Sequence, residues 1–110
     1  MEQMVMKGSK RKIAVPLFGD RVSPHFGSSS RFLVVMTEKE NILDQMVLDL
    51  NENGPLQQAR QLVSLGVGGV LCGGIQMRYK EWLIRKGVDV VDNQRGNVQN
   101  ILKEFLGRNE

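Results

Sequence analysis

The chain has very little of the chemistry that builds disulfides, zinc sites and catalytic triads. Its 110 residues include one cysteine, Cys72, and one histidine, His25. A single cysteine cannot form an internal disulfide, which fits a reducing cytoplasm. The sequence has no C-x-x-C pair for zinc, and one histidine among scattered acids gives no Ser-His-Asp set. These shortages argue against a disulfide-stabilised protein, a zinc module and a triad hydrolase.

Other classes are excluded by what the apolar and glycine-rich stretches lack. No apolar run approaches the roughly 18 residues that cross a bilayer, so no membrane partner is expected. The charged N-terminus is followed by no apolar stretch, so no secretory signal is expected and the cytoplasm is the predicted location. The segment GVGGVLCGG lacks the Lys-Ser/Thr of a phosphate loop. The segment IAVPLF carries none of the carboxylates that a two-metal nuclease places on its strands.

The positive charge is concentrated at the N-terminus, although the pI of 9.3 suggests a nucleic-acid partner at first sight. Residues 1–12 carry four basic side chains and one acidic one, a net of +3, and residues 13–110 sum to zero. A short basic segment of this kind indicates a solvated tail, and no nucleic acid is expected. The predicted organisation is a flexible leader at 1–11, one domain at 12–107 and a C-terminal tail at 108–110.

The hydrophobic pattern changes period at Asn53-Gly54-Pro55. Before it, three short apolar runs joined by turns predict an antiparallel meander of strands. After it, apolar spacing typical of helices alternates with two short buried strands. The predicted strands are 12–18, 31–37, 42–50, 69–72 and 88–91, and the predicted helices begin at Pro55, near residue 76 and near Val98.

This order, β-β-β-α-β-α-β-α, predicts a single α/β domain with a five-stranded mixed sheet and helices on its faces. The third strand is the most polar and is expected near an edge. Pro16 removes a ladder donor from the first strand, so it predicts a local bulge or a place where pairing stops.

Ligands in open α/β sheets favour the carboxyl ends of parallel strands, where the strand order reverses. The first strand runs into a loop that holds Arg21, His25, Phe26 and Gly27, and the fourth runs into Cys72, Gly73 and Gly74. If these strands are parallel neighbours, the two loops lie side by side. The pattern therefore predicts one crevice that the only imidazole and the only thiol of the chain both face.

Each of these residues also has a purely structural interpretation. His25 can be a packed loop residue, and Cys72 can be a small apolar filler at the end of a buried strand. Gly73-Gly74 can simply turn the chain, or can expose backbone N–H groups to an anion at the start of the second helix. Arg21 and Arg31 can be solvated charges, and Trp82 is expected in the core.

Four segments resemble the dinitrogenase iron-molybdenum cofactor biosynthesis family, which includes nitrogenase accessory factors. They are KIAVP, VSPHFGSSSRF, GVGGVLCGGI and LIRKGVDVV, and the resemblance covers about residues 12–107. It implies a ribonuclease H-like fold without nuclease activity and non-catalytic binding of metal-sulfur clusters. His25 stands at the family's histidine position, whereas a ligand role for Cys72 depends on the predicted crevice alone.

The function expected first is a small non-catalytic carrier of an iron-molybdenum or related metal-sulfur cluster or its precursor. His25 and Cys72 are the expected metal ligands, since imidazole and thiolate both bind iron, molybdenum or copper. Gly73, Gly74, Arg21, Phe26 and Gly27 are expected around them, with Arg21 or Arg31 balancing the negative charge. A protein partner in cluster assembly is expected as well. The alternatives are a cluster-free interaction or regulatory module that binds a protein or small anion, and an enzyme with His25 as general base, which lacks an identifiable orienting partner.

Overall fold

The structure, a computed structural model, describes residues 10–50 and 54–108. A mixed sheet carries three helices on its faces. The strands are β1 (Lys10–Phe18), β2 (Arg21–Val22), β3 (Arg31–Glu38), β4 (Asn41–Asp49), β5 (Gly69–Leu71) and β6 (Asp89–Val91). The helices are α2 (Pro55–Ser64), α3 (Met77–Arg85) and α4 (Val98–Arg108).

The sheet is antiparallel on one side of β1 and parallel on the other. Its order is β4-β3-β1-β5-β6, and β2 pairs with β1 outside that path. β1 pairs antiparallel with β3 and parallel with β5, which is in turn parallel to β6. The predicted α/β class, the element order and the edge position of the third strand are therefore confirmed.

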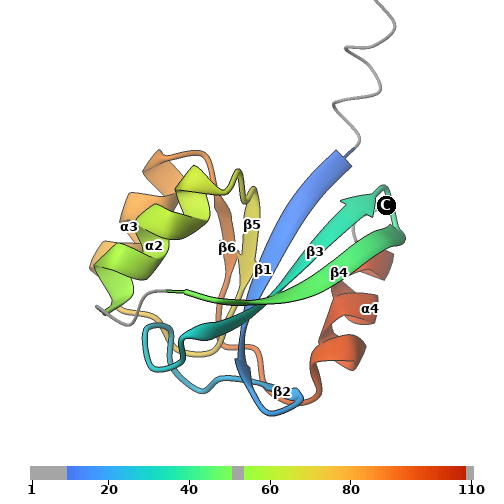
Figure 1. Cartoon of the computed structure of the whole chain (residues 1–110), viewed down its shortest axis with the longest axis horizontal. Helices are drawn as coiled ribbons and strands as arrows, with labels where there is room; N and C mark the ends of the chain where they lie inside the picture. The colour runs from blue at the N-terminus through green and yellow to red at the C-terminus, as the bar shows by residue number, and fades with distance from the viewer. Residues whose placement is uncertain (1–9, 51–53, 109–110) are drawn as a thin grey trace, which may run out of the picture.

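Two apolar cores lie on the two faces of the sheet, and β1 is therefore buried on both sides. Ala14 points into a core that includes residues of α2 and α3, whereas Ile13 and Val15 point into a core that includes residues of α4. Figure 1 shows the corresponding layers, with α2 and α3 together on one face and α4 on the other. Because successive side chains of a strand point to opposite faces of the sheet, β1 contributes to both cores. One core is covered by α2 and α3 and the other by α4.

β1 begins two residues earlier than predicted, at Lys10. The reason is that β3 extends to Glu38 and supplies partners for Lys10 and Arg11. The Arg11 guanidinium also lies 3.0 Å from the Asp89 carboxylate. The expected leader boundary at residue 11 is therefore too late. The remainder of that leader, 1–9, lies outside the described residues, as do 109 and 110 of the expected tail.

The loop expected at 19–30 contains an additional short strand, β2, so the sheet has six strands instead of the predicted five. Gly19, with a φ of 64°, lets the chain reverse after β1, so that Leu17 pairs with Val22 and Phe18 with Arg21. The pairing of β1 with β3 stops at Pro16, as predicted, since Pro16 and Phe32 form the last pair of that ladder.

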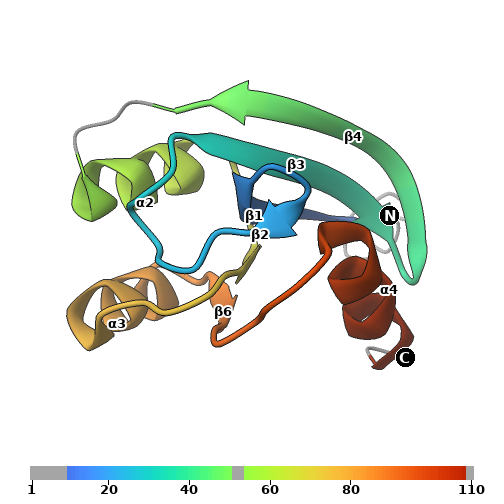
Figure 2. The same ribbon diagram turned by 90° about the horizontal axis from the view of Figure 1, so that it is seen from below.

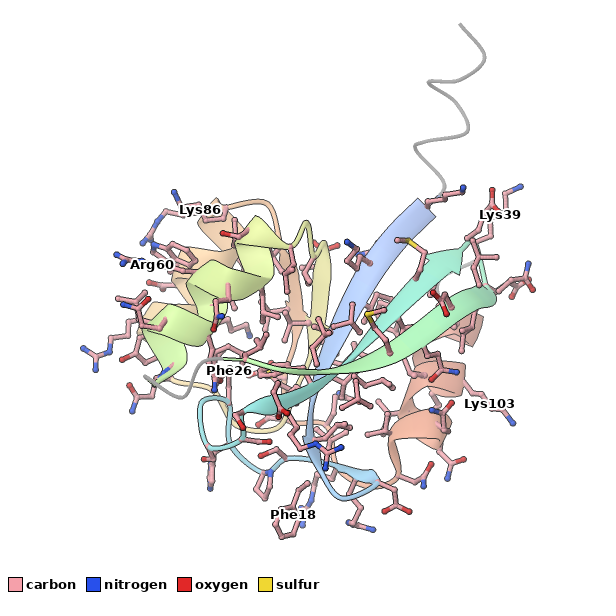
Figure 3. All side chains as sticks on the ribbon, in the orientation of Figure 1. Phe18, Phe26, Lys39, Arg60, Lys86 and Lys103 are labelled. Atoms are coloured by element: carbon pink, nitrogen blue, oxygen red, sulfur yellow. The ribbon has the colours of Figure 1, made fainter. Side chains whose placement is uncertain are left out.

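Side chains fill the space between the layers and leave the charged groups at the surface (Figure 3). Some apolar side chains are exposed as well, and Phe18 at the end of β1 is the most exposed of the large ones, at 69%. None of the helices in the described part of the chain is long and apolar enough to cross a membrane.

Candidate functional site at the carboxyl ends of the parallel strands

Three loops meet where the parallel strands β1, β5 and β6 end. They are residues 19–30 after β1, 72–76 after β5 and 92–97 after β6. Figure 2 looks onto this end of the sheet and shows the loops crossing it between α3 and α4. Three parallel strands that stop at one edge place their loops together. The strand-end rule, by which ligands in open α/β sheets favour the carboxyl ends of parallel strands, therefore applies to this edge.

Backbone hydrogen bonds join these loops into one unit. The Phe26 N–H donates to the Gly74 carbonyl at 2.8 Å, and the Gly74 N–H donates to the Pro24 carbonyl at 2.7 Å. On the other side, the Asn93 N–H donates to the Gly73 carbonyl at 2.9 Å. The predicted neighbourhood of the His25 loop and the Gly73-Gly74 turn is therefore confirmed at the level of the backbone.

Gly73 is required at this junction because two chains pass too closely for a side chain. A Cβ atom on Gly73 would lie 2.6 Å from the Ser23 carbonyl oxygen and would also collide with Pro24. Gly74 is less confined, since its Cβ would lie 3.4 Å from Nδ1 of His25. The two glycines therefore have different roles: Gly73 lets the loops pack, and Gly74 leaves room beside the imidazole.

The loops enclose a strand-end cleft of about 740 Å³. His25 and Arg21 approach it from the first loop, Gly73 and Gly74 form its wall from the second, and Arg95 contributes from the third. The remaining lining residues are Phe18, Val22, Pro24, Asn93, Gln94 and Gly96. Arg21, His25 and Arg95 are exposed, so the cleft offers an imidazole and two guanidinium groups to solvent.

A second hollow of about 430 Å³ lies on the other side of the same histidine. It shares His25 and Gly74 with the cleft and is also lined by Phe26, Gly27 and Ser28. Pro55, Ile75, Gln76 and Tyr79 complete it. Phe26 is mostly buried, and its ring meets that of Phe32 edge-on at 6.2 Å between centroids. Phe26 and Gly27 therefore border this hollow and not the strand-end cleft.

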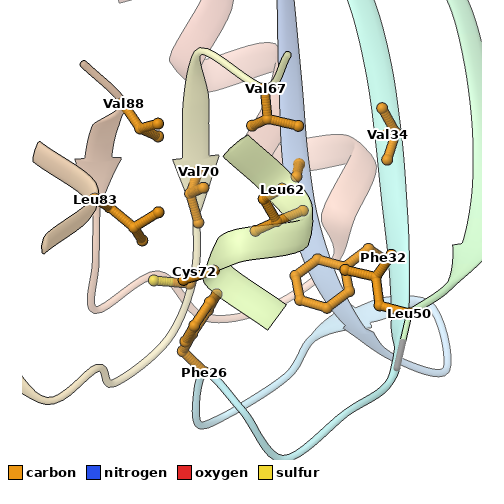
Figure 4. Close-up of a cluster of buried hydrophobic side chains, with 12 residues drawn as sticks. Phe26, Phe32, Val34, Leu50, Leu62, Val67, Val70, Cys72, Leu83 and Val88 are labelled. Carbon is orange, nitrogen blue, oxygen red and sulfur yellow. The ribbon is translucent and has the colours of Figure 1, made fainter. Parts of the chain in front are cut away.

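Cys72 does not reach either space. Its side chain is 0% exposed and belongs to the apolar core that also contains Phe26, Val70 and Leu83 (Figure 4). The expectation that Cys72 and His25 face one crevice is therefore wrong for the thiol, although their loops adjoin. Burial raises the pKa of Cys72 from 9.0 to about 12; the Asp92 carboxylate adds to the rise and Lys80 opposes it.

A half-buried ion pair supports the third wall of the cleft. The Lys80 ammonium on α3 lies 3.1 Å from the Asp92 carboxylate, at the start of the loop after β6. The Gln94 side chain donates to the Asp92 carbonyl, and the Gln94 N–H donates to the Cys72 carbonyl at 2.9 Å. These contacts fix residues 93–96 against the turn after β5, so Arg95 projects from an anchored loop.

Of the predicted site residues, the structure brings four to the strand-end cleft: Arg21, His25, Gly73 and Gly74. Arg31 lies at the beginning of β3 and does not line it. The sequence reasoning missed Phe18 and the whole segment Asn93–Gly96. A signal was present, because DNQRG follows the predicted strand VDVV at the same sheet edge, and the strand-end rule applies there equally.

The model of the family described as dinitrogenase iron-molybdenum cofactor matches residues 9–108 of the chain. The match spans all the strands and helices described above. This chain belongs to the dinitrogenase iron-molybdenum cofactor family. The resemblance stated from the four sequence segments is thereby confirmed.

Similar proteins of this dinitrogenase iron-molybdenum cofactor family member include one sequence relative and several solved structures of the same fold. The uncharacterized protein MJ0580 of Methanocaldococcus jannaschii is 23% identical over 107 residues, covering 93% of this chain and 91% of its own. The crystal structure of PH0822 superposes with a TM-score of 0.83 at 28% identity, covering 88% of this chain and 89% of that one. The apo form of the orange protein from Desulfovibrio gigas gives a TM-score of 0.73 at 23% identity, with 90% and 89% covered.

Proposed function

We propose that the protein is a small non-catalytic carrier that holds an anionic iron-molybdenum or related metal-sulfur cluster, or its precursor, in the strand-end cleft. The observation that carries the proposal is the position of the only imidazole of the chain, exposed in a cleft that two arginines also line. Membership in the dinitrogenase iron-molybdenum cofactor family supports this choice of cargo.

The donor set fits a preassembled cluster better than a bare metal ion. The described residues contain no group of three or more His, Cys, Asp or Glu side chains that could hold a metal ion. The Cys72 thiol is buried, and its raised pKa keeps it protonated at neutral pH. A cluster that brings its own sulfide ligands needs only one further ligand from the protein, and His25 can supply it.

The electrostatics of the cleft favour a negatively charged cargo. Arg21 and Arg95 both line it, and the Asp92 carboxylate next to its wall is paired with Lys80. Within residues 10–50 and 54–108, the backbone N–H groups of Gly73 and Arg95 have no hydrogen-bond acceptor. Guanidinium and amide donors of this kind bind sulfides or oxyanions at the periphery of a cluster.

The same environment argues against general-base catalysis by His25. In the described part of the chain, the imidazole has no hydrogen bond to a carboxylate or carbonyl that would orient it. A single protein ligand also gives a loose attachment, which suits a protein that must release its cargo. We therefore assign His25 the role of a ligand and propose no reaction for the protein.

Anaerobic reconstitution tests this function. The protein is incubated with tetrathiomolybdate, or with iron and sulfide, and desalted, and retained metal is read from the absorption spectrum and from metal analysis. We expect cluster absorption to remain with the wild-type protein and to fall at least about tenfold with Arg21→Glu/Arg95→Glu. Equal retention by both proteins, or none by the wild type, would contradict the carrier function and favour the cluster-free module.

A further inference from the structure

Among the described residues, the outer edge of β4 is the longest exposed strand edge, and its sequence is complementary to itself. β4 spans nine residues, and within residues 10–50 and 54–108 it pairs only with β3. It contains neither lysine nor arginine nor proline, the residues with which edge strands usually prevent pairing with another chain. Met46 and Val47 are 52% and 47% exposed, although both are large and apolar.

The register of β4 on β3 shows which side chains of the edge share a face. Met46 lies opposite Val34 and Leu48 opposite Phe32, on the face covered by α2. Val47 lies opposite Leu33, on the other face. Residues 45–49, with the sequence QMVLD, thus read polar, apolar, apolar, apolar, polar around Val47.

We propose that two copies of this chain associate by antiparallel pairing of their β4 edges, with the two-fold axis at Val47. In this register Val47 faces Val47 of the second copy, and Met46 faces Leu48 of the second copy on the same sheet face. Gln45 then faces Asp49 of the second copy. Apolar groups meet apolar groups at the centre and polar groups meet at both ends, which is the arrangement that stabilises cross-strand pairs.

The polar ends of this register are free to pair. The side-chain oxygen of Gln45, Oε1, accepts a hydrogen bond from Nε2 of Gln99 at 3.0 Å. The side-chain NH₂ group of Gln45 is therefore available as a donor. Asp49 is exposed and has no hydrogen bond or ion pair from its carboxylate among the described residues. An amide opposite a carboxylate avoids the repulsion that two facing aspartates would produce.

The paired segment ends at a bulge, which supplies a matched control. Asp44 lies opposite Met36 and Ile42 opposite Thr37, so Leu43 is an extra residue without a partner on β3. Leu43 is 50% exposed, like Val47, but lies outside the pairing register. The strand-end cleft is bounded by the loops after β1, β5 and β6, so β4 pairing leaves this cleft open and does not depend on cargo.

Sedimentation velocity from about 10 μM to about 1 mM tests the proposal. We expect the wild-type protein to form dimers over this range, and Val47→Lys and Val47→Glu to weaken self-association at least about tenfold because like charges face each other. An equimolar mixture of these two variants should restore dimers, and Leu43→Lys should dimerise like the wild type. A monomeric wild type, an undiminished dimer in Val47→Lys or a monomeric mixture would each overturn the proposal, and circular dichroism verifies that all variants fold.

Discussion

At the scale of single residues, Cys72 lies in the core although the residue that follows it lies in the cleft wall. The next residue along the chain, Gly73, lines the strand-end cleft, whereas the thiol is fully buried beside Phe26 and Leu83. Its chemistry follows from this burial, because a thiolate inside an apolar core loses its hydration.

Cys72→Ala should lower the free energy of unfolding by about 1 kcal/mol, since it removes one buried sulfur atom from a packed core. Cys72→Asp should cost several times more, because an ionised carboxylate would be buried without a partner. Urea denaturation at pH 7 measures both changes. An alanine variant more stable than the wild type would show that the thiol does not fill its site.

The stability contributed by Cys72 should decline in alkaline solution. Its pKa is raised from 9.0 to about 12 in the folded protein. Between these values the unfolded chain releases the proton while the folded protein keeps it, so unfolding becomes easier as the pH rises. Relative to Cys72→Ala, which cancels other titrating groups, the wild type should lose about 1 kcal/mol between pH 8 and pH 10. A difference between the two proteins that stays constant over this range would contradict a raised pKa.

At the scale of elements, the cleft depends on how closely the loops after β1 and β5 pass. Gly73→Ala would place a methyl group 2.6 Å from the Ser23 carbonyl oxygen. We expect it to lower the free energy of unfolding by roughly 2–3 kcal/mol, because two backbone segments must move apart. The matched control is Gly107→Ala on α4, where a Cβ meets no atom within 4 Å. It should be neutral or stabilising, since alanine favours helices.

Thermal denaturation followed by circular dichroism compares the two glycine variants. If Gly73→Ala melts at the temperature of the wild type, the loops are not closely packed there. The comparison separates a requirement for space from the general effect of replacing glycine, because both variants add the same methyl group.

Sequence patterns predicted the strands and helices because β1 and β3 contain short, continuous apolar runs and the three helices have clear helical spacing. They could not show β2, since Arg21–Val22 is too short to have a period and is strand only because Gly19 turns the chain onto β1. The strand-end rule located His25 and Gly74 correctly. It could not give the direction of the Cys72 side chain, which depends on whether the chain has already left the pleat of β5.

At the scale of the whole molecule, the sheet begins at Lys10 among the residues that the structure describes. Lys10 pairs with Glu38, and the basic side chain of Lys12 donates to the Leu65 carbonyl at 2.8 Å. We expect a chain that begins at Lys10 to keep its free energy of unfolding within about 0.5 kcal/mol, because it retains the described β1 in full. A chain that begins at Ile13 should lose more, because β1 then lacks three paired residues. Urea denaturation distinguishes the two truncations, and equal loss from both would show that residues 1–9 contribute to the fold.

The central claim for the whole protein is the proposal that His25, and not Cys72, holds the cargo. An anaerobic titration with tetrathiomolybdate, followed by absorption, compares the wild type, His25→Ala and Cys72→Ala at pH 7. We expect His25→Ala to bind at least about tenfold more weakly, a loss of ~1.4 kcal/mol or more, because the cleft loses its one metal ligand. Cys72→Ala should bind like the wild type. Unchanged affinity in His25→Ala would contradict a cargo held by His25 in the strand-end cleft, and lost affinity in Cys72→Ala would contradict the assignment of the buried thiol to the core.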